Sequence, residues 1–264
     1  MTDRSEYSTP KGLKIQAQNA LAGCFSRAVM LILSYFIWLY LISYAGSIIS
    51  YMLAKIPFVS EVKGGIGANI AFSVITSLIA AVFSVLSEMF TCGLDLYFLN
   101  ISTGRDAQNH DLFRGFVREP GIVCRISAFL MLPSILLMIP FNVFSELYSL
   151  TADKDHLIIS VVFLALSLIV SLYMHLTYGL AFFFMLDFPS YSAGKILGIT
   201  AQKMKGNRLR LFLLDIRFIP MIILGILSFG LGLLWVYPVI IESHALFFLN
   251  LMNPAHYIPY DERL

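Results

Sequence analysis

Four long apolar runs, free of Asp, Glu, Lys and Arg, dominate the pattern of hydrophobic and polar positions along this chain. They are residues 28–54, 66–87, 126–144 and 157–186, the last interrupted only by His175. A helix needs about 20 apolar residues to cross the hydrocarbon core of a bilayer, and each run is close to that length or longer. The pattern therefore predicts an all-α, polytopic membrane protein.

Three long apolar stretches begin with the same short pattern, a glycine followed four residues later by an arginine. The pairs are Gly23 and Arg27, Gly121 and Arg125, and Gly206 and Arg210. The stretches also end alike, in Tyr97-Phe98-Leu99-Asn100-Ile101, Phe184-Met185-Leu186-Asp187-Phe188 and Phe247-Phe248-Leu249-Asn250-Leu251. A pattern that returns along a chain predicts one structural unit used several times, and here the unit is a helical hairpin.

We predict a helical bundle of six transmembrane helices, arranged as three parallel hairpins in a single membrane domain. A hairpin crosses the bilayer twice, so its copies share one orientation. The hairpins are assigned to residues 23–102, 121–188 and 206–253, and the tails and loops to residues 1–22, 103–120, 189–205 and 254–264. Amphipathic patterns at 111–117 and 192–205 predict interfacial elbows. The outer turn of the first hairpin is expected at 55–67.

Small residues recur at four-residue spacing in the second predicted helix. They are Ser73, Ser77 and Ala81, and again Ala80 and Ser84. Because small side chains allow helix backbones to approach closely in a bilayer, this spacing predicts a tight helix–helix contact.

The last third of the chain allows two interpretations. Residues 218–241 form one crossing, which gives five helices in all, or residues 209–229 and 233–252 form two crossings around a turn at 230–232. We favour two crossings, because Asn250 then ends the third hairpin as Asn100 ends the first.

The composition supports the membrane class and the charge distribution orients the chain. Hydrophobic residues make up 58% of the sequence and charged residues 13%, against about 25% charged in ordinary soluble domains. Most basic residues lie in the N-terminal segment and in residues 101–125 and 188–210. Because basic loops stay on the cytoplasmic side, both loops and both termini are expected in the cytoplasm.

The sequence lacks the motifs of the common enzyme and cofactor classes. It has no His-Glu-x-x-His, no Walker lysine loop, no Gly-x-Ser-x-Gly and no Cys-x-x-Cys. We therefore expect no enzyme, no cofactor, no metal and no nucleic-acid partner. The first residues do not have the pattern of a cleavable signal peptide. The three cysteines, Cys24, Cys92 and Cys124, are interpreted as small packing residues.

Ionisable residues inside the predicted helices are the candidate chemical groups. Ionisable groups within a membrane mark functional sites by default. Glu88, His175, Glu242 and His244 are candidates for a ligand or proton site between hairpins; Asp95, Asp215 and Arg217 are candidates for ion pairs. The alternative interpretation is that each group satisfies a neighbour and only fixes helix register.

The arginines of the repeated pattern have two interpretations as well. Arg27, Arg125 and Arg210 would gather lipid phosphates at the cytoplasmic surface, or they would serve only as anchors that fix the orientation of the helices.

The final third also resembles a known family. Met204-Lys205-Gly206-Asn207 is followed by Leu214-Asp215-Ile216-Arg217-Phe218 and then by Phe229-Gly230-Leu231-Gly232-Leu233-Leu234-Trp235-Val236-Tyr237-Pro238. This order is similar to the uncharacterised bacterial integral-membrane family catalogued as domain of unknown function 975. The resemblance is specific over about 190–252 and looser elsewhere, where Asn100 and Phe113 agree. Pro220-Met221 replaces the usual tryptophan, a departure that alters the expected kink.

The family has no established activity, so the resemblance implies membrane class and extent and carries no mechanism. Because the family occurs mainly in Gram-positive bacteria, it also implies a plasma-membrane location. From the residues themselves, the leading hypothesis is a non-enzymatic component that binds or transports a small or amphipathic ligand between hairpins. The alternative is a scaffold or accessory subunit that binds membrane lipids or a protein partner. A polar cavity reaching Glu88 and His175 would favour the ligand hypothesis, and a dry, tightly packed centre the scaffold.

Overall fold

The computed structural model describes residues 8–55 and 66–253, whose secondary structure consists of helices joined by turns and contains no β-strand. Most of the outer turn predicted at 55–67 lies outside these residues, as does the C-terminal tail predicted at 254–264. The prediction of an all-α protein is confirmed for the part of the chain that is described.

Twelve helical elements follow one another along the described chain. They are α1 (Pro10–Leu21), α2 (Phe25–Ala54), α4 (Ile66–Ser102), η2 (Asn109–Phe113), α5 (Arg114–Val117), α6 (Pro120–Thr151), α7 (Lys154–Tyr178), α8 (Ala181–Asp187), α9 (Ala193–Met204), α10 (Arg208–Ile216), α11 (Ile219–Leu227) and α12 (Leu233–Met252). Five spans among the described residues are long and apolar enough to cross a membrane, namely α2, α4, α6, α7 with α8, and α12. The bundle of membrane helices predicted from the apolar runs is therefore confirmed.

The third predicted hairpin differs from the other two. The crossing expected at 209–229 consists of two nine-residue helices, α10 and α11. Pro220 lies in the first turn of α11, where its ring removes the hydrogen bond to Ile216 and ends α10 at that residue. Each helix is too short to cross alone, and the five candidate spans among the described residues do not include this predicted crossing.

The turn predicted at 230–232 is present. Ser228 Oγ donates to the Gly225 carbonyl at 2.7 Å and accepts from the Gly232 amide at 2.8 Å. A Cβ atom on Gly232 would lie 2.8 Å from the Gly225 Cα. Two glycines therefore let α11 and α12 meet at their backbones, and residues 218–241 do not form one continuous helix.

The chain divides into two compact units. Unit 1 comprises Met1–Ile37, Met89–Val123 and Leu176–Leu264, and unit 2 comprises Trp38–Glu88 and Cys124–His175. The boundaries fall inside α2, α4, α6 and α7, whereas the third hairpin belongs to unit 1 alone.

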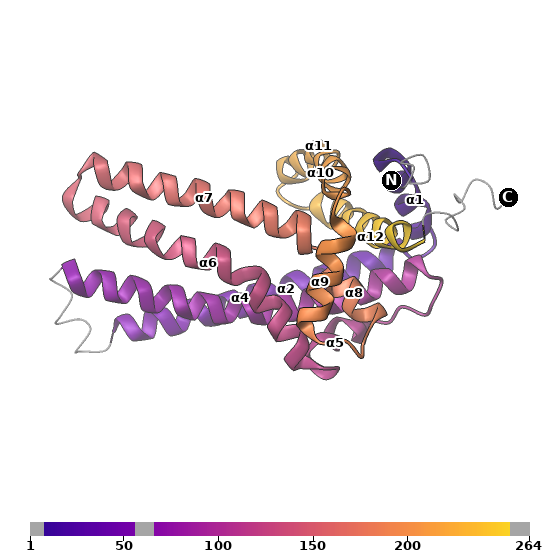
Figure 1. The fold of residues 1–264 in the computed structure, drawn as a ribbon, viewed down its shortest axis with the longest axis horizontal. Coiled ribbons are helices and arrows are strands. Elements are labelled where there is room, and N and C mark those ends of the chain that lie inside the picture. Colours follow the sequence, from indigo (N-terminus) through magenta and orange to yellow (C-terminus); the bar gives the residue numbers. More distant parts are fainter. Residues whose placement is uncertain (1–7, 56–65, 254–264) are drawn as a thin grey trace. The chain divides into compact units, whose positions relative to one another are not determined.

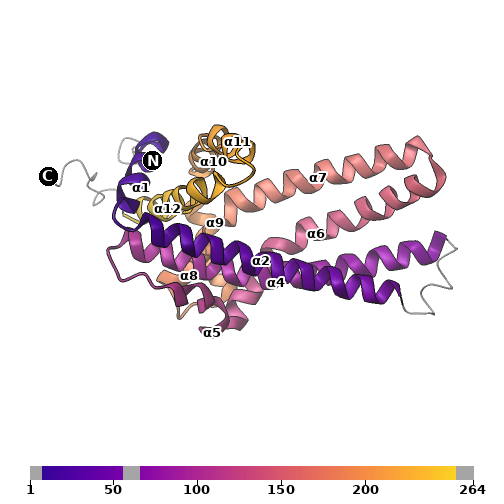
Figure 2. The ribbon, with the colours of Figure 1, turned by 180° about the vertical axis from the view of Figure 1, so that it is seen from behind.

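In unit 1, the N-terminal helix α1 packs against α12 and α10, and both views show α1 beside α12 (Figure 1, Figure 2). Thr9 caps α1 by accepting from the Gly12 amide at 3.2 Å. Leu13, Ala17 and Leu21 are fully buried, because residues four apart share one face of a helix. Much of the segment assigned to a tail, residues 1–22, is thus a packed helix.

The remaining core of unit 1 is aromatic. Phe183 and Phe184 of α8 contact Phe248 of α12, with ring centroids 5.6 and 5.0 Å apart. Tyr97 and Phe98 of α4 are also almost fully buried. The ends of all three predicted hairpins therefore contribute aromatic side chains to this core.

Unit 2 is built from the remaining parts of α2, α4, α6 and α7. The Asn142 amide of α6 donates to Ser77 Oγ of α4 at 3.1 Å, and Phe144 of α6 stacks on Phe163 of α7 at 6.2 Å. Pro133 and Pro140 lie inside α6, which continues through both. Prolines are tolerated in membrane helices because hydroxyls and neighbouring helices satisfy the freed carbonyls.

Candidate functional site

A cavity of about 460 Å³ lies in unit 2 between α2 and α4. Its walls carry five serines and few other polar groups; they are Ile42, Ser43, Gly46, Ser47, Ser50, Ala80, Phe83, Ser84 and Ser87. Small-residue spacing predicted a tight contact here. The helices are close at Gly46, where a Cβ atom would lie 3.1 Å from the Phe83 ring, but Ala80 and Ser84 border open space.

Four of the five serines of this cavity have already used their donor groups. Ser47 and Ser50 donate to carbonyls of α2, and Ser84 and Ser87 donate to carbonyls of α4, at 2.8–3.0 Å. A hydroxyl group has one proton and two lone pairs. These side chains therefore offer acceptor oxygens, and the cavity suits a ligand that brings hydrogen-bond donors.

The predicted residues Glu88 and His175 belong to the same unit as the cavity. Glu88 lies one helical turn beyond Ser84, on the face of α4 that lines the cavity, and is partly buried. His175 is exposed near the end of α7. Neither residue lines the cavity directly. Of the two, only Glu88 lies one helical turn from a residue that does.

Glu242 lies in unit 1 and is 0% exposed. Ser102 Oγ at the end of α4 donates to its Oε1 at 2.7 Å, while its buried Oε2 has no hydrogen-bond partner among the described residues. An unsatisfied buried acceptor is unusual in proteins. Glu242 does not line the serine cavity, so its contact with Ser102 indicates a structural link between α4 and α12.

His244 faces a different neighbour from Glu242. Its Nε2 lies 2.7 Å from Oδ1 of Asp215 on α10. Residues two apart on a helix point in nearly opposite directions, so the two candidates of α12 do not form one cluster. Arg217 and Asp95 were two of the candidates for ion pairs. Arg217 is exposed at the end of α10, while Asp95 is buried in α4.

The three arginines of the repeated pattern have different environments. Arg27 and Arg125 are exposed at the starts of α2 and α6. Arg210 is half-buried: it donates to the Ser8 carbonyl at 3.0 Å and to Asn250 Oδ1, and its guanidinium lies 4.7 Å from the centre of the Phe247 ring. Arg210 therefore holds the N-terminal segment on α12, which favours the structural interpretation for this arginine.

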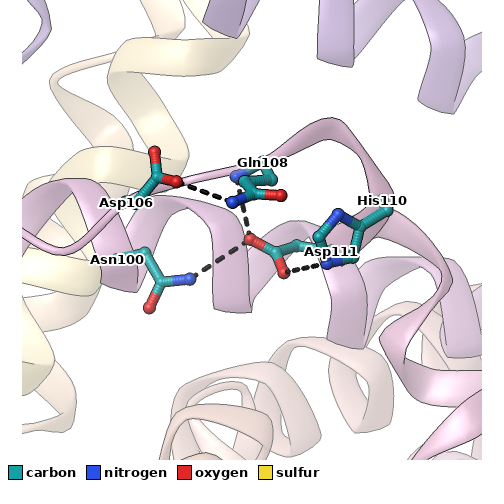
Figure 3. Close-up of polar contacts among 5 residues, drawn as sticks. All are labelled: Asn100, Asp106, Gln108, His110 and Asp111. Carbon is teal, nitrogen blue, oxygen red and sulfur yellow. Dashed lines mark hydrogen bonds and ion pairs between the residues drawn. The ribbon is translucent and has the colours of Figure 1, made fainter.

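A polar cluster around Asp111 was missed by the sequence analysis. Its buried Oδ2 accepts from the Asn100 amide at 3.2 Å and from the Gln108 backbone amide at 3.1 Å, and Oδ1 lies 3.8 Å from His110 Nε2 (Figure 3). Gln108 also donates to Asp106 at 2.6 Å. The spacing of Gln108 and Asp111 is that of a capping box, a signal that would have located this turn.

Asn100 and Asn250, the matching ends of the first and third hairpins, make matching contacts. Asn100 donates to Asp111 in η2, which together with α5 precedes α6, and Asn250 Oδ1 accepts from the Ser8 amide just before α1 at 3.2 Å. Between them, α8 at the end of the second hairpin packs on α9. Each returning helix thus contacts a short helix that precedes an outgoing one.

The described residues contain no group of three or more His, Cys, Asp or Glu able to hold a metal ion. No curated protein and no solved structure matches the chain. A family model described as "Protein of unknown function (DUF975)" matches residues 1–255, which extends the resemblance over 190–252 to almost the whole sequence. The chain, with its helices apolar enough to cross a membrane, therefore belongs to the DUF975 family.

Proposed function

We propose that the protein is a non-enzymatic component of the bacterial plasma membrane that binds or carries a small amphipathic ligand with hydrogen-bond donors. The observation that carries the proposal is the cavity of about 460 Å³ between α2 and α4. Ligand pockets in proteins range from about 300 to about 1,000 Å³. The site lies inside the first hairpin, whereas the sequence had suggested a site between hairpins.

The chemistry of the walls sets the class of ligand. The hydroxyls of Ser47, Ser50, Ser84 and Ser87 present acceptors, because each donates to its own helix. Glu88 adds a carboxyl group one turn beyond Ser84. A protonated primary amine on an alkyl chain supplies three donors and one positive charge, and its tail suits the apolar wall at Ile42 and Phe83.

The proposal includes three parallel hairpins with both termini in the cytoplasm. It is supported by the order of elements, in which a short helix precedes each pair of longer segments. It is also supported by the contacts of Asn100 with η2 and of Asn250 with the residues before α1. In this arrangement α10 and α11 together make the outgoing limb of the third hairpin.

A second function, a membrane scaffold or accessory subunit, is favoured by the interior of unit 1. The aromatic ends of the three hairpins are buried together there, and polar groups such as Arg210 and Asp111 bind other parts of the chain. A closely packed interior of this kind suits a protein whose surface binds a partner.

Binding of an alkylamine separates the two functions. Purified protein in lipid nanodiscs is titrated with radiolabelled decylamine, and bound label is counted. We expect saturable binding that Ser84→Leu weakens by about tenfold or more, since the added side chain fills the cavity and removes an acceptor. Glu88→Gln is expected to weaken it as well, because the amide lacks the charge.

The matched control is Ser171→Leu, which makes the same change at an exposed position of α7 in the same unit. This control is expected to bind decylamine as the unchanged protein does. Equal binding by Ser84→Leu and Ser171→Leu would refute the cavity as the site. Folded protein that binds no decylamine at saturating concentrations would favour the scaffold.

A further inference from the structure

A second, smaller cavity lies in unit 1 at the turn between α5 and α6. It has room for one oxygen-sized atom, at about 20 Å³. Its walls combine two arginines with apolar side chains; they are Cys92, Arg114, Arg118, Glu119, Met185, Leu186 and Pro189. The proposed ligand cavity in unit 2 shares none of these residues.

The position of Arg114 is fixed by a close contact between α4 and α5. A Cβ atom on Gly93 would lie 2.1 Å from the Leu112 carbonyl oxygen, and one on Gly115 would lie 2.2 Å from that of Met89. Phe90 of α4 also packs edge-on against Phe116, with ring centroids 4.7 Å apart. The backbone that carries Arg114 therefore has little freedom, and its guanidinium group is presented from a rigid base.

Within the described residues, Arg114 and Arg118 form no ion pair. The Nε atom of Arg114 is buried and has no hydrogen-bond partner among the described residues. Glu119 shares the wall, yet it forms no ion pair with Arg114 or Arg118 within the described chain. A buried charged donor without a partner is costly, and an anionic oxygen in the cavity would satisfy it.

Phosphate is the anion that best fits two neighbouring guanidinium groups, because their planar forks match its oxygens. The source of the phosphate follows from the surroundings. Arg118 lies two residues before α6, one of the candidate membrane spans, so the cavity is at the level where a span begins. Phe113 and Val117, beside the arginines on η2 and α5, are 38% and 79% exposed.

We propose that Arg114 and Arg118 bind the phosphate of an anionic phospholipid, with one phosphate oxygen in the small cavity and the acyl region against Phe113 and Val117. The site is distinct from Arg27, Arg125 and Arg210, which the sequence had suggested for this role. It does not depend on which side of the membrane the turn faces, because both arginines precede the same span.

The test uses the full-length protein in detergent and counts bound lipid by native mass spectrometry during titration with phosphatidylglycerol. Arg114→Gln with Arg118→Gln is expected to weaken the tightest site about thirtyfold, from the loss of two cationic contacts. Arg114→Lys with Arg118→Lys keeps the charge but loses the planar fork. Its affinity for phosphatidylglycerol is therefore expected to lie between that of the unchanged protein and that of the double glutamine variant.

Lys203→Gln with Lys205→Gln is the matched control, because it removes two exposed basic side chains at the end of α9. It is expected to leave the tightest site unchanged. If the arginine-to-glutamine and lysine-to-glutamine double variants lose phosphatidylglycerol equally, the lipid responds to the overall charge of the protein, and the proposed site is refuted. Unchanged binding in the arginine variant refutes it equally.

Two further arms distinguish phospholipid from free phosphate and locate the acyl region. Inorganic phosphate is expected to displace little phosphatidylglycerol, since it lacks the acyl region; displacement at equal concentrations would show that free phosphate is the ligand and overturn the lipid assignment. Val117→Glu places a negative charge at an exposed position, so it is expected to weaken binding without disturbing the core. Full binding in Val117→Glu would contradict the proposed lipid position, even if the arginine variant fails to fold.

Discussion

Units 1 and 2 differ in the side chains that they bury. The largest fully buried side chains all belong to unit 1, among them Tyr97, Phe184 and Phe248. Side chains buried in unit 2 include Ser127, Ser160 and Ser167, while Trp38, Leu168 and many other large apolar residues of that unit are exposed.

The difference shows how each unit is stabilised. Unit 1 has the interior of a water-soluble protein, where burial of aromatic surface stabilises the fold. Unit 2 has many large apolar residues outside, and its buried side chains include small hydroxyl residues beside Ile126 and Met174. This is the pattern of helices that associate in lipid, where apolar surface gives no driving force and close packing and hydrogen bonds remain. The loose contact that leaves a cavity is therefore tolerated in unit 2.

The largest difference in stability between the two units is expected at Phe248. Phe248→Ala is expected to lower the free energy of unfolding by about 4 kcal/mol, because the ring fills the centre of unit 1. Phe163→Ala in unit 2, where the ring is partly exposed, is expected to cost clearly less. Unfolding by SDS in mixed micelles measures both. Equal losses would show that the two units are stabilised in the same way.

The contact of α4 with α5 should be nearly as sensitive. Gly115→Ala places a methyl group 2.2 Å from a backbone oxygen and is expected to destabilise unit 1 by about 3 kcal/mol. Gly198→Ala is the control, since a Cβ atom there meets nothing within 4 Å. A stable Gly115→Ala protein, with the thermal midpoint of Gly198→Ala, would contradict the close contact.

A medium loss of stability is expected when the hydrogen bonds of Arg210 in unit 1 are removed. Arg210→Ala removes charged hydrogen bonds to Ser8 and Asn250 and is expected to cost about 2 kcal/mol. Hydrogen exchange would show α1 opening faster than in Arg217→Ala, which truncates an exposed arginine. If the α1 amides are equally protected from exchange in both variants, the hydrogen bonds of Arg210 do not hold the N-terminal segment in place.

The smallest effect is expected in unit 2. Asn142→Ala removes the hydrogen bond between α6 and α4, and such interhelical bonds in membranes average about 0.6 kcal/mol. The same SDS titration measures the loss. A loss as large as that expected for Arg210→Ala would mean that unit 2 depends on its polar contacts as strongly as unit 1 does.

The long helices were predictable because each apolar run extends over a complete span. The division of the third hairpin was not predicted, although Pro220 was visible. The first half of 209–229 carries Arg210, Asp215 and Arg217, and the second half has no charged residue. This pattern alone does not show that Pro220 ends α10, whereas α6 continues through Pro133 and Pro140.

The candidate site was predictable only in part. Glu242 and His244 were predicted to contribute to one ligand or proton site, but their spacing of two residues places them on opposite faces of α12. The serines of α2 and α4 have the same pattern whether the helices touch or separate. The cavity depends on how α2 and α4 separate beside the close contact of Gly46 with Phe83, which is a property of the packed pair.

The three-hairpin arrangement is tested most directly by the sides of the two termini. Epitope tags at each end are probed with antibody on intact spheroplasts and again after permeabilisation. The account predicts that both tags are protected in intact spheroplasts and accessible afterwards, because α10 and α11 together complete an even number of crossings. A C-terminal tag exposed on intact spheroplasts, with the N-terminal tag protected, would mean five crossings and would contradict the repeated hairpin.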